Sequence, residues 1–335
     1  MSKTISALID AFGSRKISFG FAIGFAIAIA SPIPVAAQTA FPSKPLRLIV
    51  AFGPGGVADT VGRLVGQQLN ERFGQPVVVD NRAGAGGIVA AKLVAAAPSD
   101  GYTLLVITGA VVINAVTSKE GVDPRNQLTT VAVAASAPTI FAANRAITAN
   151  NLMDYLRSIK GGHFTYSTAG IGTAEHLTSE FIFKAIPGLA ATHVPYPGGG
   201  AAVTAVLGQQ VDLVTTPVPS AMSFIKDGRL RALAVASHKR ISSLPEVPTL
   251  AEAGFADFEN MTWIAFFAPA KVPASVVSLL NTEINNVLRQ PNVRERLALL
   301  GFDTRSGSHA EAAAYVKNEA AKWERIVKTT GFVHN

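Results

Sequence analysis

Residues 46–69, LRLIVAFGPGGVADTVGRLVGQQL, constrain the possible folds of this chain more than any other segment. Residues 46–52 form an almost unbroken apolar run, which predicts a strand buried on both faces of a parallel sheet. The run ends in a glycine loop at 53–56, after which apolar residues recur at the three- and four-residue spacing of a helix. In an open α/β sheet, such a loop lies at the carboxyl end of its strand, where ligands bind, and the helix start favours an anion.

The same alternation of short apolar runs and helical patterns continues along the chain. Residues 76–79 and 102–108 are predicted strands with a helix at 88–97 between them, and a second set of strands and helices fills 151–236. Two longer strands, 129–143 and 261–268, are predicted to connect the sets, and helices are predicted over most of 274–330. We therefore expect an α/β fold of two domains, each a mainly parallel sheet flanked by helices.

The N-terminal residues 1–37 have the pattern of a cleavable secretory signal. Lys3, Arg15 and Lys16 precede an apolar run at 17–30, and the small residues before position 38 suit cleavage after Ala37. A membrane anchor is the alternative reading, but a span needs about 20 apolar residues and this run is shorter. The sequence therefore predicts a protein that is exported and loses this segment by cleavage.

Composition excludes several classes of site. The chain of 335 residues has no cysteine, so disulfides, cysteine nucleophiles and thiolate metal ligands are excluded. The formal net charge is +7, but the basic residues are scattered and lack the runs typical of a nucleic-acid-binding surface. The six histidines lack the short spacings of a metal site. We expect no nucleic-acid partner, no cofactor and no metal.

Two glycine-rich segments have similar sequences and suggest a shared cleft. PGGVADTV at 54–61 and PGGGAAVT at 197–204 each open a predicted helix. Glycines of this kind also occur in ordinary turns, so neither loop requires a ligand, and neither is a nucleotide-binding motif. Asp59 suits the first turn of its helix as a stabilising carboxylate, and the alternative is a ligand role toward a cation or an ammonium group.

The segment 167–173, STAGIGT, offers more hydrogen-bond donors than helix capping requires. Its three hydroxyls and its backbone N–H groups precede a helix predicted to start near Glu175. The surplus predicts contact with a carboxylate or similar oxygen-rich group through uncharged donors. A Ser167–His176 nucleophile is the alternative, but the GxSxG elbow is absent, which leaves an exported hydrolase as the less favoured reading.

The chain resembles the periplasmic substrate-binding proteins of tripartite tricarboxylate transport, the Bug family. Nearly all of the chain after residue 37 takes part, through FPSKPLRLIVAFGPGGVADTVGR at 41–63, GQPVVVDNRAGAGG at 74–87, DGYTLL at 100–105, STAGIGTAEHL at 167–177, HVPYPGGGAAVTAVLGQQVDL at 193–213, LRALAVAS at 230–237 and LPEVPTLAEAGF at 244–255. The resemblance implies a two-domain clamp of the type II periplasmic-binding-protein kind. The expected domains are 38–142 with 258–335, and 143–257.

The resemblance also implies a site and a function. Ligand carboxylates would be held in the interdomain cleft by Gly55, Gly56, Val57 and Asp59 on one side and by Ser167, Thr168, Gly172, Thr173, Tyr196 and Gly199 on the other. The expected protein is a monomeric, non-enzymatic receptor that captures a di-, tri- or aromatic carboxylate and delivers it to membrane transporter subunits. The alternative is a receptor of the same fold that signals to a sensor kinase. Val57-Ala58 replaces a more polar pair common in the family, which removes a possible hydroxyl donor for a citrate-like ligand.

Overall fold

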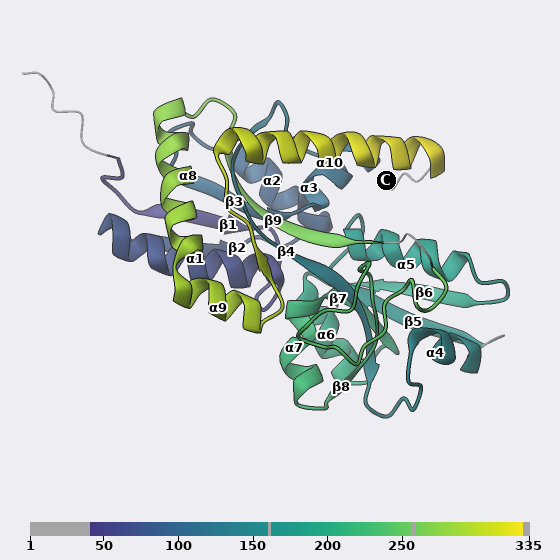
Figure 1. Ribbon diagram of the computed structural model, residues 1–335. Coiled ribbons are helices and arrows are strands. Elements are labelled where there is room, and N and C mark those ends of the chain that lie inside the picture. Colours follow the sequence, from purple (N-terminus) through teal and green to yellow (C-terminus); the bar gives the residue numbers. More distant parts are fainter. Residues whose placement is uncertain (1–40, 160–161, 256–258, 331–335) are drawn as a thin grey trace, which may run out of the picture. The chain divides into compact units, whose positions relative to one another are not determined.

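The computed structural model describes residues 41–159, 162–255 and 259–330 (Figure 1). The predicted signal segment and its cleavage site lie outside the described residues. The strands are β1 Leu46–Val50, β2 Val77–Asn81, β3 Thr103–Thr108, β4 Leu128–Asn144, β5 His163–Thr168, β6 Ala190–Pro195, β7 Leu213–Pro217, β8 Leu230–Val235, β9 Met261–Pro269 and β10 Asp303–Thr304. The helices are α1 Val57–Phe73, the 3-10 turn η1 Ala85–Gly87, α2 Ile88–Ala95, α3 Ala110–Thr117, α4 Leu152–Ser158, α5 Ala174–Lys184, α6 Gly199–Leu207, α7 Val218–Lys226, α8 Ala274–Arg289, α9 Pro291–Leu299 and α10 His309–Thr330.

The described strands form one mixed sheet in the order β2-β1-β3-β9-β4-β7-β5-β6, with β8 and β10 both paired to β4. β1 is parallel to β2 and β3, and β5 is parallel to β6 and β7, as the alternation of strands and helices predicted. β9 and β4 run antiparallel to their neighbours and join these two parallel units. The α/β fold class is confirmed, and the antiparallel strands make the whole sheet mixed.

The long strand β4 passes from one half of the sheet to the other. It pairs with β9 as far as Pro138 and with β7 from Thr139 onward. The sequence predicted both long strands, β4 and β9, and the structure confirms them. The division into domains 38–142 with 258–335, and 143–257, stays a prediction.

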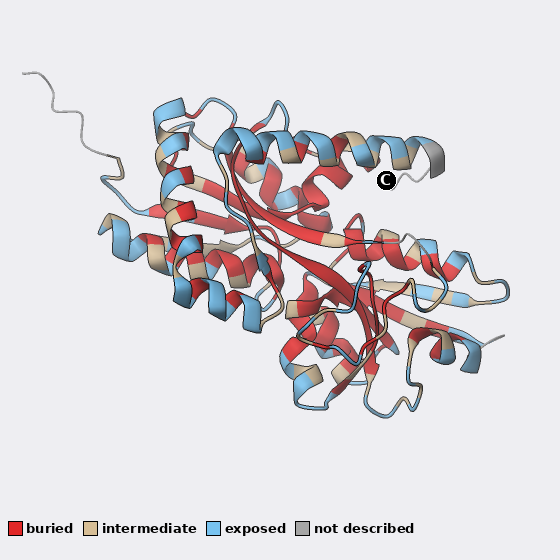
Figure 2. Cartoon of the chain, viewed as in Figure 1, coloured by how far each residue is buried: buried red, intermediate tan, exposed pale blue. Residues whose placement is uncertain are grey.

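Apolar residues bury both faces of the sheet under helices (Figure 2). In the first half, β1, β3 and β9 share a core with α1, α2, α3, α8 and α10. In the second half, Ile140 and Ala142 of β4 pack with α6 and α7, while Phe141 and Ala143 pack with α4 and α5. Neighbouring residues face opposite ways because side chains alternate along a strand. The loops at the carboxyl ends of the strands are left to form a site.

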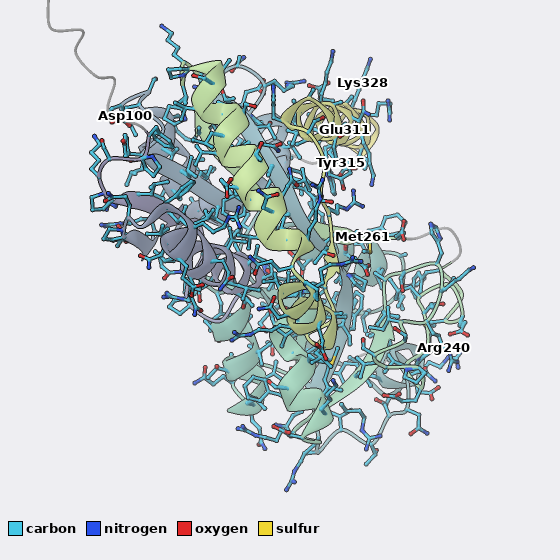
Figure 3. All side chains as sticks on the ribbon, turned by 60° about the vertical axis from the view of Figure 1, so that its left-hand side comes forward. Asp100, Arg240, Met261, Glu311, Tyr315 and Lys328 are labelled. Atoms are coloured by element: carbon cyan, nitrogen blue, oxygen red, sulfur yellow. The ribbon has the colours of Figure 1, made fainter. Side chains whose placement is uncertain are left out.

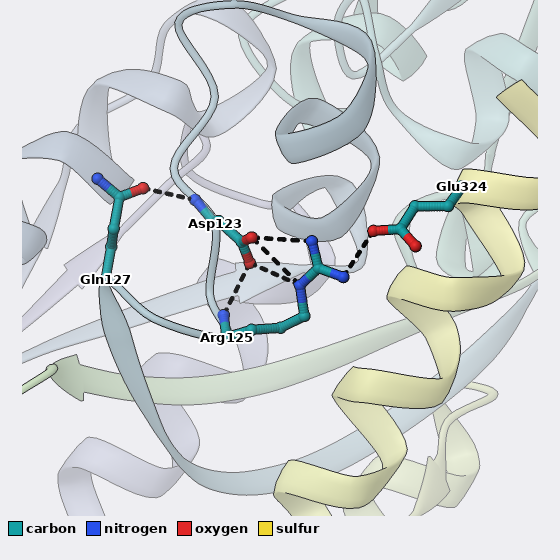
Figure 4. A network of polar contacts seen from close by, with 4 residues as sticks. All are labelled: Asp123, Arg125, Gln127 and Glu324. Atoms are coloured by element: carbon teal, nitrogen blue, oxygen red, sulfur yellow. Dashed lines mark hydrogen bonds and ion pairs between the residues drawn. The ribbon is translucent and has the colours of Figure 1, made fainter. Parts of the chain in front are cut away.

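An ion-pair network ties α10 to the loop before β4 (Figure 4). The guanidinium of Arg125 donates to Asp123 from Nε at 2.9 Å and from Nη2 at 2.8 Å, and its Nη1 donates to Glu324 at 2.6 Å. Gln127 accepts the backbone N–H of Asp123 at 2.8 Å. Hydrogen bonds to the two carboxylates raise the pKa of Arg125 above its ordinary value.

Most charged side chains of the described chain lie on the outside, while Asp59 and Glu175 are buried. Figure 3 shows Arg240 and Lys328 projecting from the surface, and both residues are exposed. Tyr315 on α10 packs inward against Trp263, with 5.6 Å between ring centroids. Within the described ranges, none of the helices combines the length and the apolar character needed to cross a bilayer.

Candidate functional site

A buried cavity lies where the carboxyl ends of strands from both halves of the sheet meet the starts of helices. We call it the central cavity, and its volume in this structure is about 20 Å³, which is room for about one water molecule. The first half of the sheet contributes the β1–α1 loop and the end of β3, and the second half contributes the β5–α5 loop, α6, the end of β7 and α7. This is the position at which open α/β sheets bind ligands. The lining residues are Phe52, Gly56, Val57, Thr108, Ala169, Thr173, Glu175, Gly199, Pro217 and Ser220.

The two glycine loops touch beside the central cavity. The backbone N–H of Gly53 donates to the carbonyl of Pro197 at 2.8 Å. A Cβ added at Gly200 would lie 2.7 Å from the carbonyl oxygen of Pro54, which is too close for any side chain. Glycine is therefore needed at position 200 for this approach of two backbones. The expectation that the segments 54–61 and 197–204 face each other is confirmed.

The helices α1 and α6 begin at the central cavity without a side-chain cap. The first N–H groups of a helix have no intrahelical partner, and the aligned peptide dipoles add positive potential there. The start of α5 differs, because the Thr173 hydroxyl accepts the N–H of His176 at 3.3 Å. No lysine, arginine or histidine lines the central cavity among the described residues. Its potential donors are therefore uncharged.

Two buried hydroxyls next to Gly199 have no hydrogen-bond partner among the described residues, Thr216 on β7 and Ser220 on α7, and Ser220 lines the central cavity. They flank Gly199, since a Cβ added there would lie 3.0 Å from Thr216 Oγ1 and 2.8 Å from Ser220 Oγ. An unsatisfied buried hydroxyl costs about 1–3 kcal/mol, which a polar ligand can relieve. The sequence analysis did not predict either hydroxyl. The available signal was their position at the end of a buried strand and the start of the next helix.

The structure brings some of the predicted ligand-binding residues together. Gly56, Val57, Thr173 and Gly199 line the central cavity. Gly55 and Tyr196 line a neighbouring groove that also contains Gly200 and Ser220. The Tyr196 N–H is bonded to the carbonyl of Thr168 at 3.0 Å, so its backbone supports the loop.

The other predicted residues of the 167–173 loop stabilise the loop itself. Ser167 is fully buried, and its hydroxyl donates to the carbonyl of Ala202 at 3.0 Å, away from the central cavity. The hydroxyl of Thr168 lies 2.7 Å from Nε2 of His193. Gly172 has a φ of 76°, which shapes the turn before α5. None of these three lines the central cavity, and a ligand role for them stays a prediction.

Asp59 also makes its contacts within the protein. Its carboxylate accepts the N–H of Gly55 at 3.0 Å, Nε of Arg63 at 2.9 Å and Nδ2 of Asn81 at 2.9 Å. The residue is only 4% exposed, so these bonds satisfy a buried charge. The structural reading of Asp59 accounts for this arrangement, and its ligand role stays a prediction.

Glu175 is the one ionisable side chain among the described lining residues of the central cavity. It is 3% exposed, and the hydroxyl of Thr262 on β9 donates to its Oε1. Burial raises the pKa of the Glu175 carboxyl, since no cation offsets the desolvation of the charged form. The sequence analysis treated Glu175 only as a helix start. A glutamate in a first helical turn is common, so no local signal marked it as a cavity residue.

The side-chain rings of Tyr166, His193 and His176 stack beside the 167–173 loop. His176 and His193 lie with ring centroids 4.1 Å apart, and Tyr166 stacks on the other side of His193 at 5.0 Å. Burial lowers the pKa of His193 to about 3, so this imidazole is neutral at physiological pH. In the described part of the chain, no group of His, Asp and Glu side chains is arranged to hold a metal ion.

Comparison with known proteins gives one consistent family. The model of a family described as "Tripartite tricarboxylate transporter family receptor" matches residues 61–332. A protein encoded in the tcbD-tcbE intergenic region of Pseudomonas sp. (strain P51) is 36% identical over 319 residues, which cover 94% of this chain and 94% of that protein. Protein BugT of Bordetella pertussis is 32% identical, over 92% of this chain and 96% of its own length.

Solved structures with the same fold include proteins with bound dicarboxylates. The periplasmic binding protein BugD is 30% identical with a TM-score of 0.84, over 88% of this chain and 100% of its own. A protein of R. palustris with adipate is 30% identical with a TM-score of 0.82, over 88% and 99% of the two chains. MatC from Rhodopseudomonas palustris with bound malate is 29% identical with a TM-score of 0.80, over 86% and 100%.

Proposed function

The chain belongs to the tripartite tricarboxylate transporter receptor family of periplasmic solute-binding proteins, and we propose that it captures a small organic carboxylate in the central cavity. It then delivers this ligand to the membrane subunits of a tripartite tricarboxylate-type transporter. The family and the fold are those of binding proteins, and we propose that this chain likewise catalyses no reaction.

One observation carries the proposal: uncharged donors surround the central cavity, and no basic side chain of the described residues lines it. The starts of α1 and α6 are uncapped, and two hydroxyls beside them lack partners. A carboxylate placed there would accept N–H and O–H donors that have no other described acceptor. Helix starts favour anions, and hydrogen bonds to a charged group each contribute about 1.5–3 kcal/mol.

The ligands named with two related structures support a chemical class. Adipate and malate are small dicarboxylates, which supports the same chemical class here. In this structure the central cavity has a volume of only about 20 Å³, so a dicarboxylate would require the surrounding loops to move apart.

A thermal-shift screen followed by calorimetric titration tests the proposal. The panel contains succinate, malate, glutarate and adipate, with butyrate as the monocarboxylate control and succinamide as the uncharged control. A ligand at a hundredfold excess over its dissociation constant adds about 2.7 kcal/mol of stability, which we expect to raise the melting temperature by several degrees. The proposal fails if no carboxylate in a wider panel binds, or if succinamide binds as tightly as succinate.

Two further measurements test delivery and the absence of catalysis. Bound ligand should be recovered chemically unchanged after long incubation with the protein. Uptake of the identified carboxylate into cells should require both the receptor and the membrane subunits. Uptake that is unchanged after deletion of the receptor would contradict delivery, and a released product would contradict the non-enzymatic role.

A further inference from the structure

We propose that Glu175 recognises the ligand as an uncharged carboxylic acid, donating its own O–H to an oxygen of the bound carboxylate. This inference rests on the proposed function, because the acceptor is an oxygen of that ligand. It assigns to Glu175 a role in specificity, and it makes the affinity depend on pH through a group of the receptor.

Glu175 lies where it can meet a ligand in the central cavity. It is in the first turn of α5 and lines the same space as Gly56 from the first half of the sheet and Gly199 and Ser220 from the second. The residue is 3% exposed, so its carboxyl is largely shielded from bulk water. A ligand carboxylate held by the helix starts would lie beside the Glu175 carboxyl once the cavity of about 20 Å³ widens to admit it.

The elements around Glu175 carry few ionisable groups. α5 packs on β6, β7 and β9, and the cavity is completed by β3, α6, α7 and the β1–α1 loop. The last residue of α7, Lys226, donates from Nζ to the Leu299 carbonyl at 3.4 Å. The segments β3, β7, β9 and α6 contain no Asp, Glu, His, Lys, Arg or Tyr anywhere in their lengths. An ionised Glu175 would therefore have no cation from these elements and would face an anionic ligand at close range. Two like charges in one buried site repel strongly, and one of them must take up a proton.

The remaining ionisable groups nearby are engaged elsewhere. His193, from β6, is neutral and contacts the Thr168 hydroxyl. On α5 itself, His176 stacks on His193, with its Nδ1 facing the N–H of Gly172 at 3.4 Å. Glu180 lies farther along α5.

The partners of Glu180 and of the first turn of α1 are likewise accounted for. Glu180 pairs with Lys184 at 2.6 Å and accepts the Tyr166 hydroxyl at 2.6 Å. At the start of α1, Asp59 pairs with Arg63 at 2.9 Å. Both basic groups are thus already matched to carboxylates other than Glu175.

The existing contacts of Glu175 are compatible with a carboxylic acid. Thr262 donates to Oε1. Burial has the largest effect on the pKa of the Glu175 carboxyl and raises it, while hydrogen bonds with Thr262, with its own backbone and with the Thr173 side chain lower it. With Oε1 as the carbonyl oxygen of the acid, we place the proton on Oε2. An O–H donor toward a ligand carboxylate forms a charge-assisted bond, which is shorter and stronger than a bond between uncharged groups. Where Glu175 is ionised before binding, it takes its proton from solvent, so binding takes up at most one proton for each ligand.

The test is calorimetric titration with malate and with adipate between pH 6 and 8.5, where both probes are largely dianions. We compare wild type with Glu175→Gln, whose amide donates at every pH, and with Glu175→Ala. Glu180→Gln is the matched control on the same helix, outside the central cavity. Circular dichroism and thermal melts check that every variant is folded.

The expected result separates the three proteins. Near pH 6, Glu175→Gln should bind within about threefold of wild type, while Glu175→Ala should bind at least about tenfold more weakly. Wild-type affinity should fall by up to about tenfold for each pH unit once Glu175 begins to ionise, while Glu175→Gln stays flat. In buffers of different ionisation enthalpy, wild type should take up between zero and one proton. Wild-type affinity could instead be as independent of pH as that of Glu175→Gln while Glu175→Ala still binds more weakly. That result would show that Glu175 is uncharged over the whole pH range measured.

Three results would overturn the inference while leaving the proposed function intact. Glu175→Gln could bind as weakly as Glu175→Ala, wild-type affinity could rise with pH, or Glu175→Ala could bind as wild type does. A fourth contrary result is tight binding of aspartate that Glu175→Gln abolishes, because Glu175 would then be an ionised partner of an ammonium group. If wild type binds no carboxylate at any pH, the proposed function fails and this inference fails with it.

Discussion

Replacing Ser220 by alanine should stabilise the ligand-free protein and weaken ligand binding. The residue is 8% exposed, and its hydroxyl has no hydrogen-bond partner among the described residues. Alanine removes one buried oxygen and enlarges the cavity by only that atom, and it has the highest helix propensity. Part of the 1–3 kcal/mol penalty of an unsatisfied group should be recovered, giving a gain of about 1 kcal/mol. For a chain of this size, that gain corresponds to roughly 2–4 °C in melting temperature.

The same substitution should act in the opposite direction on affinity. If the Ser220 hydroxyl donates to the ligand carboxylate, its loss removes a hydrogen bond to a charged group, worth about 1.5–3 kcal/mol. At 1.36 kcal/mol for each factor of ten, the dissociation constant should rise roughly 10- to 150-fold. A purely structural serine would not produce this pair of opposite effects.

Urea denaturation measures the stability, and calorimetric titration with malate and adipate measures the affinity. Ser223→Ala is the matched control, because Ser223 lies farther along α7 and is exposed. It should change neither quantity by more than about 0.5 kcal/mol. The reasoning is refuted if Ser220→Ala binds within about twofold of wild type, or if it destabilises the ligand-free protein by about 1 kcal/mol or more.

Three other substitutions test separate parts of the site. Gly200→Ala should weaken carboxylate binding by about tenfold or more, because its Cβ would lie 2.7 Å from the Pro54 carbonyl oxygen. Gly208→Ala is the control and should leave the affinity unchanged, since its nearest contact is at 3.4 Å. Equal affinities of the two variants by calorimetry would contradict this prediction. Asp59→Ala should lower the free energy of unfolding in urea by about 1.5–3 kcal/mol, since three donors lose their acceptor, and a change below about 0.5 kcal/mol would show that those bonds contribute little. Burial raises the pKa of Glu175 in the folded protein, so its protonated form contributes stability that is complete at acidic pH and is lost as pH rises through the folded pKa. Glu175→Gln should therefore gain stability relative to wild type between pH 5 and pH 8 in urea melts, and a difference that shrinks with rising pH would argue against a buried neutral acid.

The sequence by itself determined the fold class and predicted several of the loops that line the candidate site. The apolar run that forms β1 is buried throughout except for Arg47, and the change of period after Gly56 marks where α1 begins. The lengths of β4 and β9 were visible as continuous apolar segments, and the order of motifs indicated the family. These features are local, because strand and helix periodicity depend on which residues follow one another. α3 was not predicted, since its apolar residues show no clear alternation between two faces.

Only the tertiary structure decided which polar groups face the central cavity. Ser167 and Ser220 both lie near the junction of a buried strand and a helix, yet Ser167 donates to Ala202 and Ser220 has no described partner. In the sequence, Glu175 is an ordinary helix-start residue. In the structure, Thr262 of β9 donates a hydrogen bond to its carboxyl. The direction of a side chain at such a junction, and the desolvation of its charge, are set by elements distant in sequence. For that reason, sequence patterns located the loops of the site but could not assign the groups that would bind the ligand.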